Sequence, residues 1–187
     1  MESVPTYILA GGASTRLGSD KARAELRGVP LIVRVARDLG PVASRLVVVA
    51  DRAGKYGDLG LDTIDDLAPG HGPLGGIQAA LHHQGPRGWL LCVSCDRVGV
   101  RLDWITSLLR SRRGADRAVA FRGERWEPFP ALLHASLGPV VDEALANGST
   151  APWRVLDRCG AVALPLPDDW GTCTDVNTRE ALQRLGG

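Results

Sequence analysis

The segment from Leu9 to Lys21 combines a glycine pair with two basic side chains, a combination typical of a phosphate-binding loop. Gly11 and Gly12 let the backbone turn sharply and bring amide groups close to an anion, while Arg16 and Lys21 add positive charge. The loop contains no G-x-G-x-x-G, so it does not match a Rossmann dinucleotide loop. Ala rather than Ser or Thr follows the lysine, so it does not match a Walker A loop either. The segment therefore predicts phosphate binding by a loop of another type.

Two aspartates are candidates for holding a divalent cation beside those phosphates. Asp96 follows the apolar segment that starts at Trp89, and Asp175 precedes Val, Asn and Thr near the end of the sequence. Mg²⁺ takes one or two carboxylates and fills its other positions with water and phosphate oxygens. The alternatives are structural, because an Asp after a strand also serves as a turn or helix cap, and Asp175 could begin a helix.

Apolar runs and helical patterns alternate along the chain, and these elements must position the loop and the aspartates. The pattern predicts strands at residues 7–10, 45–50, 62–65, 89–95, 118–121, 131–134 and 161–166. It predicts helices at residues 31–39, 74–83, 104–113, 137–146, 153–158 and 179–185. Such alternation implies a single α/β domain over residues 1–187, a three-layer α/β/α structure with a mostly parallel, Rossmann-like sheet. Ligands of such sheets bind at the carboxyl ends of the strands.

The composition excludes several classes of protein. With 187 residues, of which 44% are hydrophobic, and 22 basic against 21 acidic side chains, the chain is expected to fold as one globular domain. A formal net charge of +1 without basic runs argues against nucleic acid and an anionic membrane as partners. The N-terminus lacks the pattern of a signal peptide and no apolar run reaches about 18 residues, so we expect a cytoplasmic protein.

Cys92 and Cys95 form a C-x-x-C pair within the predicted strand at residues 89–95. Residues three apart on a strand point to opposite faces, so the two thiols can neither chelate one ion nor oxidise together. We interpret both as buried packing residues, with a redox or zinc pair as the alternative.

The segment from Leu9 to Lys21 resembles the signature of the small nucleotidyltransferases, L-A-G-G-x-S-x-R-x-G-x-x-K, and matches it at every fixed position. Within this superfamily, Asp20-Lys21-Ala22 is most similar to the molybdenum cofactor guanylyltransferases. The resemblance continues in the same order through Asp65-Asp66-Leu67, Gly72-Pro73-Leu74-Gly75-Gly76, Cys95-Asp96, Glu127-Pro128-Phe129-Pro130-Ala131-Leu132 and Asp175-Val176-Asn177-Thr178. It covers nearly the whole chain and implies a sheet of the nucleotide-diphospho-sugar transferase type.

The resemblance also implies a role for each matching residue. The nucleotide would be bound by Leu9, Ala10, Gly11, Gly12, Lys21, Asp65, Gly76 and Asp96. The catalytic residues would be Lys21, Arg16 and Asp96, with the two basic side chains on the β- and γ-phosphates. Asp96 and Asp175 would bind the catalytic Mg²⁺, and Asn177 with Asp175 would bind the acceptor. An ionised Asp can accept from N1–H and N2–H of guanine, which suits Asp65 for the guanosine, and we interpret its neighbour Asp66 as solvated.

The sequence departs from the family pattern at three places. Family members often read C-D-x-P, whereas Arg97 and Val98 follow Asp96 here, so the loop is expected to take another path and Arg97 to add charge near the reacting phosphates. Val49 stands where some members have Asn, which bears on the choice of base. Asp175 stands where the closing motif often has Asn, a change compatible with Mg²⁺ binding.

The predicted reaction is Mg²⁺-dependent transfer of GMP from GTP to molybdopterin, which yields the guanine dinucleotide cofactor and pyrophosphate. Residues from about 1 to 100 would bind the nucleotide, and residues from about 101 to 187 would bind the acceptor, near the segment from Glu127 to Leu132. Transient contacts with molybdenum-insertion and cofactor-accepting proteins are also expected. The nearest alternative is CTP with molybdopterin, or another nucleoside triphosphate with a sugar phosphate. A regulatory protein that binds a nucleotide without turnover is the alternative from another class, and the presence of both Lys21 and Asp96 argues against it.

Overall fold

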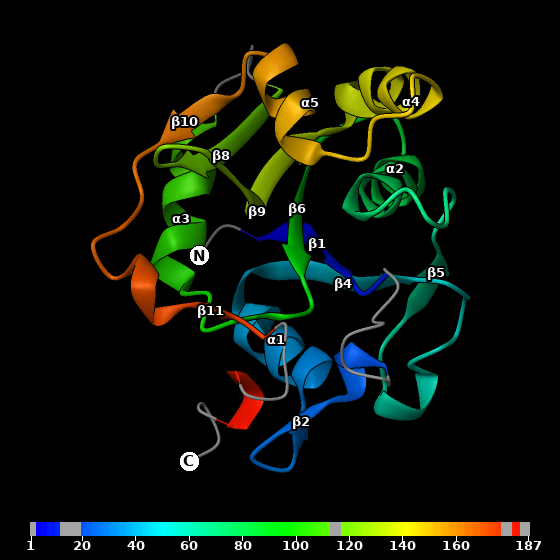
Figure 1. Cartoon of the computed structure of the whole chain (residues 1–187), viewed down its shortest axis with the longest axis vertical. Helices are drawn as coiled ribbons and strands as arrows, with labels where there is room; N and C mark the ends of the chain where they lie inside the picture. Colours follow the sequence, from blue (N-terminus) through cyan, green and yellow to red (C-terminus); the bar gives the residue numbers. More distant parts are fainter. Residues whose placement is uncertain (1–2, 12–19, 113–116, 177–180, 184–187) are drawn as a thin grey trace.

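In the computed structural model the chain forms three layers (Figure 1). The structure describes residues 3–11, 20–112, 117–176 and 181–183. The middle layer is a seven-stranded sheet with the strand order β10-β8-β9-β6-β1-β4-β5. Neighbouring strands pair in parallel except at β9, which is antiparallel to β6 and to β8. The strands are β1 (Val4–Leu9), β4 (Ala43–Ala50), β5 (Thr63–Asp65), β6 (Trp89–Ser94), β8 (Ala118–Arg122), β9 (Trp126–His134) and β10 (Val162–Leu164).

Helices cover both faces of this sheet, because its central strands are apolar on both sides. Tyr7 and Ile8 are neighbours on β1 and point to opposite faces, yet both are fully buried. The core on one face also contains side chains of α2 (Pro73–Gln84), α4 (Gly138–Ala146) and α5 (Pro152–Arg158). The core on the other face contains side chains of α1 (Leu31–Leu39) and α3 (Leu102–Ser111). The expected three-layer fold with a mostly parallel sheet is therefore confirmed.

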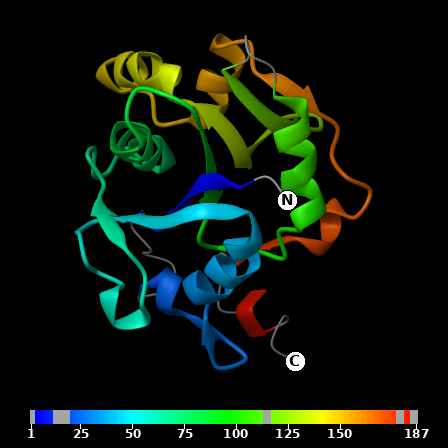
Figure 2. The same ribbon diagram turned by 180° about the vertical axis from the view of Figure 1, so that it is seen from behind.

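Two small strand pairs lie outside the main sheet. One pairs β2 (Glu25–Leu26) with β3 (Val29–Pro30), and the other pairs β7 (Arg97–Val98) with β11 (Thr174–Asp175). Leu26, Leu31 and Val176 form a small core between them, and the helical turn at residues 181–183 lies next to α1 and the β2–β3 pair (Figure 2). Short 3-10 helices complete the described structure: η1 (Lys21–Arg23), η2 (Gly40–Val42), η3 (Gly57–Leu59), η4 (Ala135–Leu137) and η5 (Trp170–Thr172).

Most of the expected elements are present within a few residues of their predicted bounds. The main difference concerns β9, which begins at Trp126 rather than at Ala131 and runs antiparallel. Two prolines in its first half disfavour a strand, but the register of β9 against β8 is interrupted there, so the prolines lie where ladder hydrogen bonds are missing. The helix expected at residues 179–185 falls partly outside the described residues. Within the described part of the chain, no helix is long and apolar enough to cross a membrane.

The C-x-x-C pair agrees with the packing interpretation. Cys92 is fully buried in the core beneath α2, and Cys95 is buried in the core beneath α1. The two thiols are free and lie on opposite faces of the sheet.

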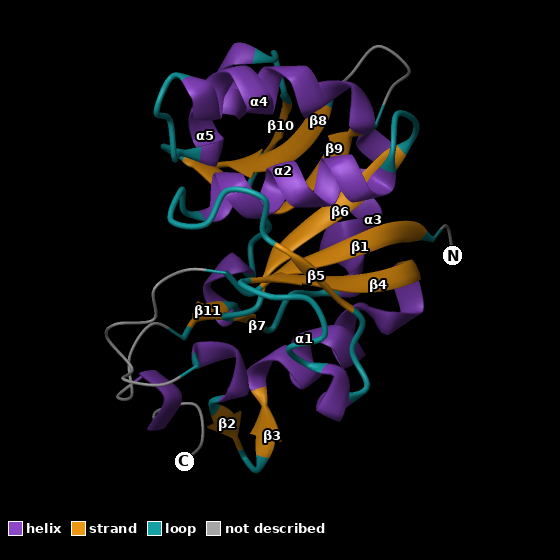
Figure 3. Cartoon of the chain, turned by 90° about the vertical axis from the view of Figure 1, so that its right-hand side faces the viewer, coloured by secondary structure: helices purple, strands orange, loops and turns teal. Residues whose placement is uncertain are grey.

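The parallel strands β1, β4, β5 and β6 end at one edge of the sheet. Leu9 lies opposite Val49 on one side and Ser94 on the other, and Ala50 lies opposite Asp65. In Figure 3 the strands β7 and β11 lie beside this edge. The fold therefore brings the ends of four strands together at the place where sheets of this kind bind ligands.

Candidate functional site

The glycine loop leaves the sheet between two neighbouring strands. The backbone amide of Ala10 donates to Val49 O at 2.8 Å, and the amide of Cys95 donates to Leu9 O at 3.0 Å, so the end of β1 is held on both sides. Gly11 follows and is exposed. The structure thus places Leu9, Ala10 and Gly11 at the carboxyl edge. Gly12 and Arg16, which were also predicted to contact the nucleotide, lie outside the described residues.

Lys21 and Asp96 meet at this edge although they are far apart in the sequence. The Lys21 ammonium forms an ion pair with Asp96 Oδ2, and the Ser94 hydroxyl donates to Asp96 Oδ1. Both charged side chains are largely enclosed, with 16% of Lys21 and 17% of Asp96 exposed. The predicted catalytic lysine and the predicted metal-binding carboxylate therefore share one site, close to where the glycine loop starts.

Asp20 anchors the turn that presents Lys21, a role that the sequence did not assign to it. It is the N-cap of η1 and accepts from the Ala22 amide at 3.1 Å. The buried Tyr56 hydroxyl donates to both Asp20 carboxylate oxygens at 3.1 Å, and the Lys55 ammonium lies 3.2 Å from Oδ2. Burial, and then the charge of Asp20, raise the pKa of Tyr56 well above its usual value, so this phenol stays protonated and keeps donating. The Asp immediately before the loop lysine was the available signal.

Asp66, rather than Asp65, lies against the glycine-rich segments. Asp65 is exposed, and its Oδ1 accepts from the Ala53 amide at 2.6 Å. Asp66 was expected to be solvated, but it is partly buried and its Oδ1 accepts from the Ala68 amide at 2.9 Å. A side-chain carbon at Gly11 would lie 3.2 Å from Asp66 Oδ2, and one at Gly75 would lie 2.8 Å from Asp66 Oδ1. The expectation for Asp66 was wrong, because the chain turns after β5 and carries this side chain inward.

The N-terminus of α2 reaches the same edge of the sheet. Gly72 is its N-cap with φ 62°, no side chain caps the helix, and Pro73 occupies its first turn. The first amides of such a helix lack intrahelical partners and favour an anion. Gly76 is buried, and a side-chain carbon there would lie 3.3 Å from Leu9 Cδ2. Its missing side chain therefore lets α2 pack closely on the end of β1.

Asp175 lies beside the site on β11 and is engaged with Arg97. The two residues are directly opposite in the β7–β11 pair, and Arg97 Nη1 lies 3.1 Å and 3.2 Å from the two Asp175 oxygens. The same nitrogen lies 3.5 Å from Glu127 Oε2, and only 9% of the Arg97 side chain is exposed. Its charge, expected near the reacting phosphates, is instead balanced by these carboxylates. The metal and acceptor roles of Asp175 remain predictions, and Asn177 lies outside the described residues.

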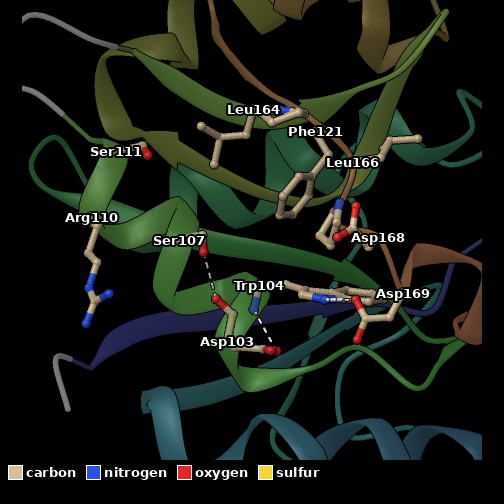
Figure 4. A pocket seen from close by; sticks show the side chains of 12 residues that line it. Asp103, Trp104, Ser107, Arg110, Ser111, Phe121, Leu164, Leu166, Asp168 and Asp169 are labelled. Atoms are coloured by element: carbon tan, nitrogen blue, oxygen red, sulfur yellow. Dashed lines mark hydrogen bonds between the residues drawn. The ribbon is translucent and has the colours of Figure 1, made fainter.

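A separate cavity of about 510 Å³ lies between α3 and the chain that follows β10 (Figure 4). Phe121, Trp104 and Asp169 are among the residues that line it. Among the described residues, none of those predicted to bind nucleotide, metal or acceptor lines this cavity. We therefore take the carboxyl edge around Lys21 and Asp96 as the candidate functional site.

Comparisons with known proteins identify the family to which the chain is similar. A family model described as a MobA-like NTP transferase domain matches residues 6–162. The molybdenum cofactor guanylyltransferase of Serratia proteamaculans is 35% identical over 182 residues, covering 96% of this chain and 92% of the relative. The probable molybdenum cofactor guanylyltransferase of Deinococcus radiodurans is 41% identical over 143 residues, covering 75% and 72%.

Solved structures show the same fold. Molybdopterin-guanine dinucleotide biosynthesis protein A from Archaeoglobus fulgidus superposes with a TM-score of 0.80 at 23% identity, covering 97% of this chain and 96% of that chain. A putative glucose-1-phosphate thymidylyltransferase from Bacillus anthracis superposes with a TM-score of 0.71 at 13% identity, covering 97% and 93%. At these identities the likeness concerns the fold alone, and it identifies the sheet as one of the nucleotide-diphospho-sugar transferase type.

Proposed function

Since the chain belongs to the family of MobA-like NTP transferase domains and is a nucleotidyltransferase, we propose that it transfers the guanylyl group of GTP to molybdopterin. The products would be the guanine dinucleotide form of the cofactor and pyrophosphate. The curated relatives named molybdenum cofactor guanylyltransferase match over most of their length, which supports both substrates. The structural observation that carries the proposal is the contact between Lys21 and Asp96 at the carboxyl edge, beside the glycine loop.

The residues around the loop suit a triphosphate. Leu9, Ala10 and Gly11 lie at the sheet edge, where Gly11 is exposed, and the first turn of α2, which has no side-chain cap, presents amides to the same region. Lys21, together with Arg16, would neutralise the β- and γ-phosphates as pyrophosphate departs. Transfer of this kind depends mainly on positioning and on charge neutralisation, so no covalent nucleophile is required.

Asp96 is the residue that best fits a catalytic Mg²⁺. Among the described residues no three His, Cys, Asp or Glu side chains gather as a metal cage, which argues against an ion held by protein ligands alone. Mg²⁺ does not need such a cage, because one carboxylate with water and phosphate oxygens can complete its coordination. When bound, the ion would add positive charge beside the phosphates. This additional charge matters because the Lys21 ammonium is already paired with the Asp96 carboxylate in the structure.

The proposed site extends from the guanosine at one end to the acceptor at the other, and it includes Asp65, Asp175 and Asn177. We assign Asp65 to the guanosine, where one of its oxygens would remain available beside the bond from Ala53. We assign Asp175 with Asn177 to the acceptor side and leave the metal to Asp96, because both Asp175 oxygens accept hydrogen bonds from Arg97. The acceptor phosphate is ionised at neutral pH, so none of these residues has to act as a general base.

Release of pyrophosphate with purified molybdopterin tests the donor and the acceptor together. We expect turnover with GTP and Mg²⁺, and a selective rise in melting temperature with GTP over CTP, ATP and UTP. Turnover with CTP and none with GTP would identify a cytidylyltransferase. Stabilisation by a nucleotide without any turnover would favour the regulatory alternative. We place the reaction in the cytoplasm, without nucleic-acid or membrane partners, and expect transient contacts with molybdenum-insertion and cofactor-accepting proteins.

A further inference from the structure

Arg97 occupies an unusual place, because it directly follows Asp96 and is nevertheless buried. It begins β7, which pairs with β11 so that Arg97 faces Asp175 across the two strands. Its Nη1 also lies 3.5 Å from Glu127 Oε2, so the guanidinium joins three segments of the chain. Opposite charges at facing positions stabilise a strand pair, and here the pair is the short one beside the site.

The Arg97 guanidinium packs on a cluster of aromatic side chains. Arg97 Cζ lies 4.3 Å from the centre of the Trp170 ring, a distance at which a cation is attracted to the ring face. Trp170 packs in turn on Trp104 and Phe121, with ring centres 4.9 Å and 5.1 Å apart. The Trp104 indole donates to Asp169 at 2.9 Å, as Figure 4 shows. Arg97 therefore packs against aromatic side chains that are themselves held by packing and a hydrogen bond.

The backbone of the same segments is held closely together. The Val176 amide donates to the carbonyl oxygen of Asp96 at 2.9 Å, which ties the end of β11 to the site residue itself. Gly99 has φ 89°, and a side-chain carbon there would lie 3.3 Å from Thr172 O. The segment from η5 to Val176 thus runs in contact with the backbone on both sides of Arg97.

We propose that Arg97 is a positioning residue: by bridging Asp175 and Glu127 above Trp170, it fixes β11 against β7 and thereby holds Asp96 in its catalytic place. Asp175 then acts on Asp96 through Arg97, in addition to its proposed place on the acceptor side. This inference rests on the proposed function for the role of Asp96. Arg suits the position better than Lys, because its planar group can stack on an aromatic ring and hydrogen-bond to a carboxylate at the same time.

The test compares Arg97→Met, Asp175→Asn and the double variant with the parent enzyme. Arg97→Met should lower kcat about tenfold, because displacing a catalytic group by about 1 Å has effects of this size or larger. The KM for GTP should change less than about threefold, since the loop and α2 that bind the nucleotide are not on these strands. Arg158→Met is the matched control, because it removes an exposed Arg–Glu143 pair between α5 and α4 and should leave kcat unchanged.

The double variant separates the proposed role of Asp175 from that of a metal ligand. If Asp175 acts on the catalytic step through Arg97, adding Asp175→Asn to Arg97→Met should change kcat at saturating molybdopterin by less than about twofold, whereas loss of its proposed contact with the acceptor would raise the KM for molybdopterin. A further loss of about threefold or more on adding Asp175→Asn would overturn the proposal, because Asp175 would then act by itself. A kcat within about twofold of the parent for Arg97→Met would overturn it as well.

Hydrogen exchange supplies a readout that does not depend on turnover. Arg97→Met should increase exchange of the amides in residues 174–176 at least about tenfold relative to Arg158→Met. Equal protection in the two variants would refute the positioning role even if the parent enzyme proved inactive on GTP, so this failure differs from a failure of the proposed function. If Arg97→Met does not fold, Arg97→Lys and Asp175→Asn decide instead: a kcat reduced about threefold in both is expected, and an unchanged kcat in both refutes the role.

Discussion

Gly75→Ala should disrupt the nucleotide edge, although Gly to Ala within a helix is usually stabilising. A side-chain carbon at Gly75 would lie 2.6 Å from Ala68 O and 2.8 Å from Asp66 Oδ1, well inside the ordinary contact distance of about 3.5 Å. Neither atom can retreat easily, because Ala68 O accepts from the His71 amide at 3.1 Å and Asp66 Oδ1 accepts from the Ala68 amide. The first turn of α2 or the turn that carries Asp66 must therefore move.

The expected loss of stability follows from two opposing effects. Forcing an extra carbon into a packed region costs about 1–3 kcal/mol, while replacing Gly by Ala in a helix gains up to about 1 kcal/mol. Because the Gly75 contact involves backbone, we expect a net loss of about 1–2 kcal/mol in the free energy of unfolding. For a chain of this size that corresponds to a fall of about 2–8 °C in the melting temperature.

Two glycines provide matched controls. At Gly76 the nearest atom to a new side-chain carbon is a terminal methyl carbon of Leu9, which can shift, so Gly76→Ala should change the free energy of unfolding by less than about 1 kcal/mol. At Gly57 nothing lies within 4 Å, so Gly57→Ala serves as the control for nucleotide binding. Urea unfolding and titration with a fluorescent GTP analogue in Mg²⁺ would measure both effects. A Gly75→Ala variant as stable as the parent, with GTP affinity reduced less than about threefold, would refute this account of the α2 N-terminus.

Three further changes have expected outcomes. Lys21→Ala should weaken GTP binding and lower turnover by more than about tenfold, since it removes a phosphate-neutralising charge; unchanged kinetics would exclude Lys21 from the site. Asp96→Asn should lower turnover at least about tenfold and raise the Mg²⁺ concentration needed for half-maximal rate, and an unchanged Mg²⁺ dependence would contradict its metal role. Burial raises the pKa of the Cys92 thiol and raises that of Cys95 to about 12, so both stay protonated in the folded chain while the unfolded chain ionises above about pH 9. Below about pH 8 the two thiols therefore do not reduce the free energy of unfolding. Above about pH 9 this free energy should fall by about 1 kcal/mol for each thiol and each pH unit. Urea midpoints at pH 8 and pH 10 measure it, and removing both thiols should reduce the decline.

Local patterns were sufficient to predict the frame of the site. The helix expected at residues 31–39 has those bounds in the structure, because its apolar positions recur at helical spacing and a proline precedes it. The strand ends that carry Gly11 and Asp96 were predicted from apolar runs, and parallel pairing then brings them to one edge. The loop motif and the resemblance added Lys21 to this edge, although its direct ion pair with Asp96 could not be predicted.

Contacts between distant segments were beyond these patterns. Asp65 was assigned to the guanosine and Asp66 to solvent, but the turn after β5 makes Asp66 the carboxylate that faces Gly11 and Gly75. The start of β9 was missed because proline lowers strand propensity, an effect that the interrupted register against β8 removes. In both cases the deciding interactions join residues that belong to different elements.

Arg97 and Asp175 illustrate what such contacts change in the interpretation of a motif. Taken one at a time, the arginine suggested extra charge for the phosphates and the aspartate suggested a second metal ligand. A guanidinium that is 9% exposed needs an acidic partner, however, because an unpaired buried charge is strongly destabilising. The facing residue on β11 supplies that partner, so Arg97 accounts for a carboxylate at position 175 without any metal. Asp96 has Lys21 as its partner, and a bound triphosphate would compete for that lysine. If the triphosphate draws Lys21 away, the Asp96 carboxylate needs another positive charge, whereas Asp175 keeps Arg97. This is the physical reason to assign the metal to Asp96.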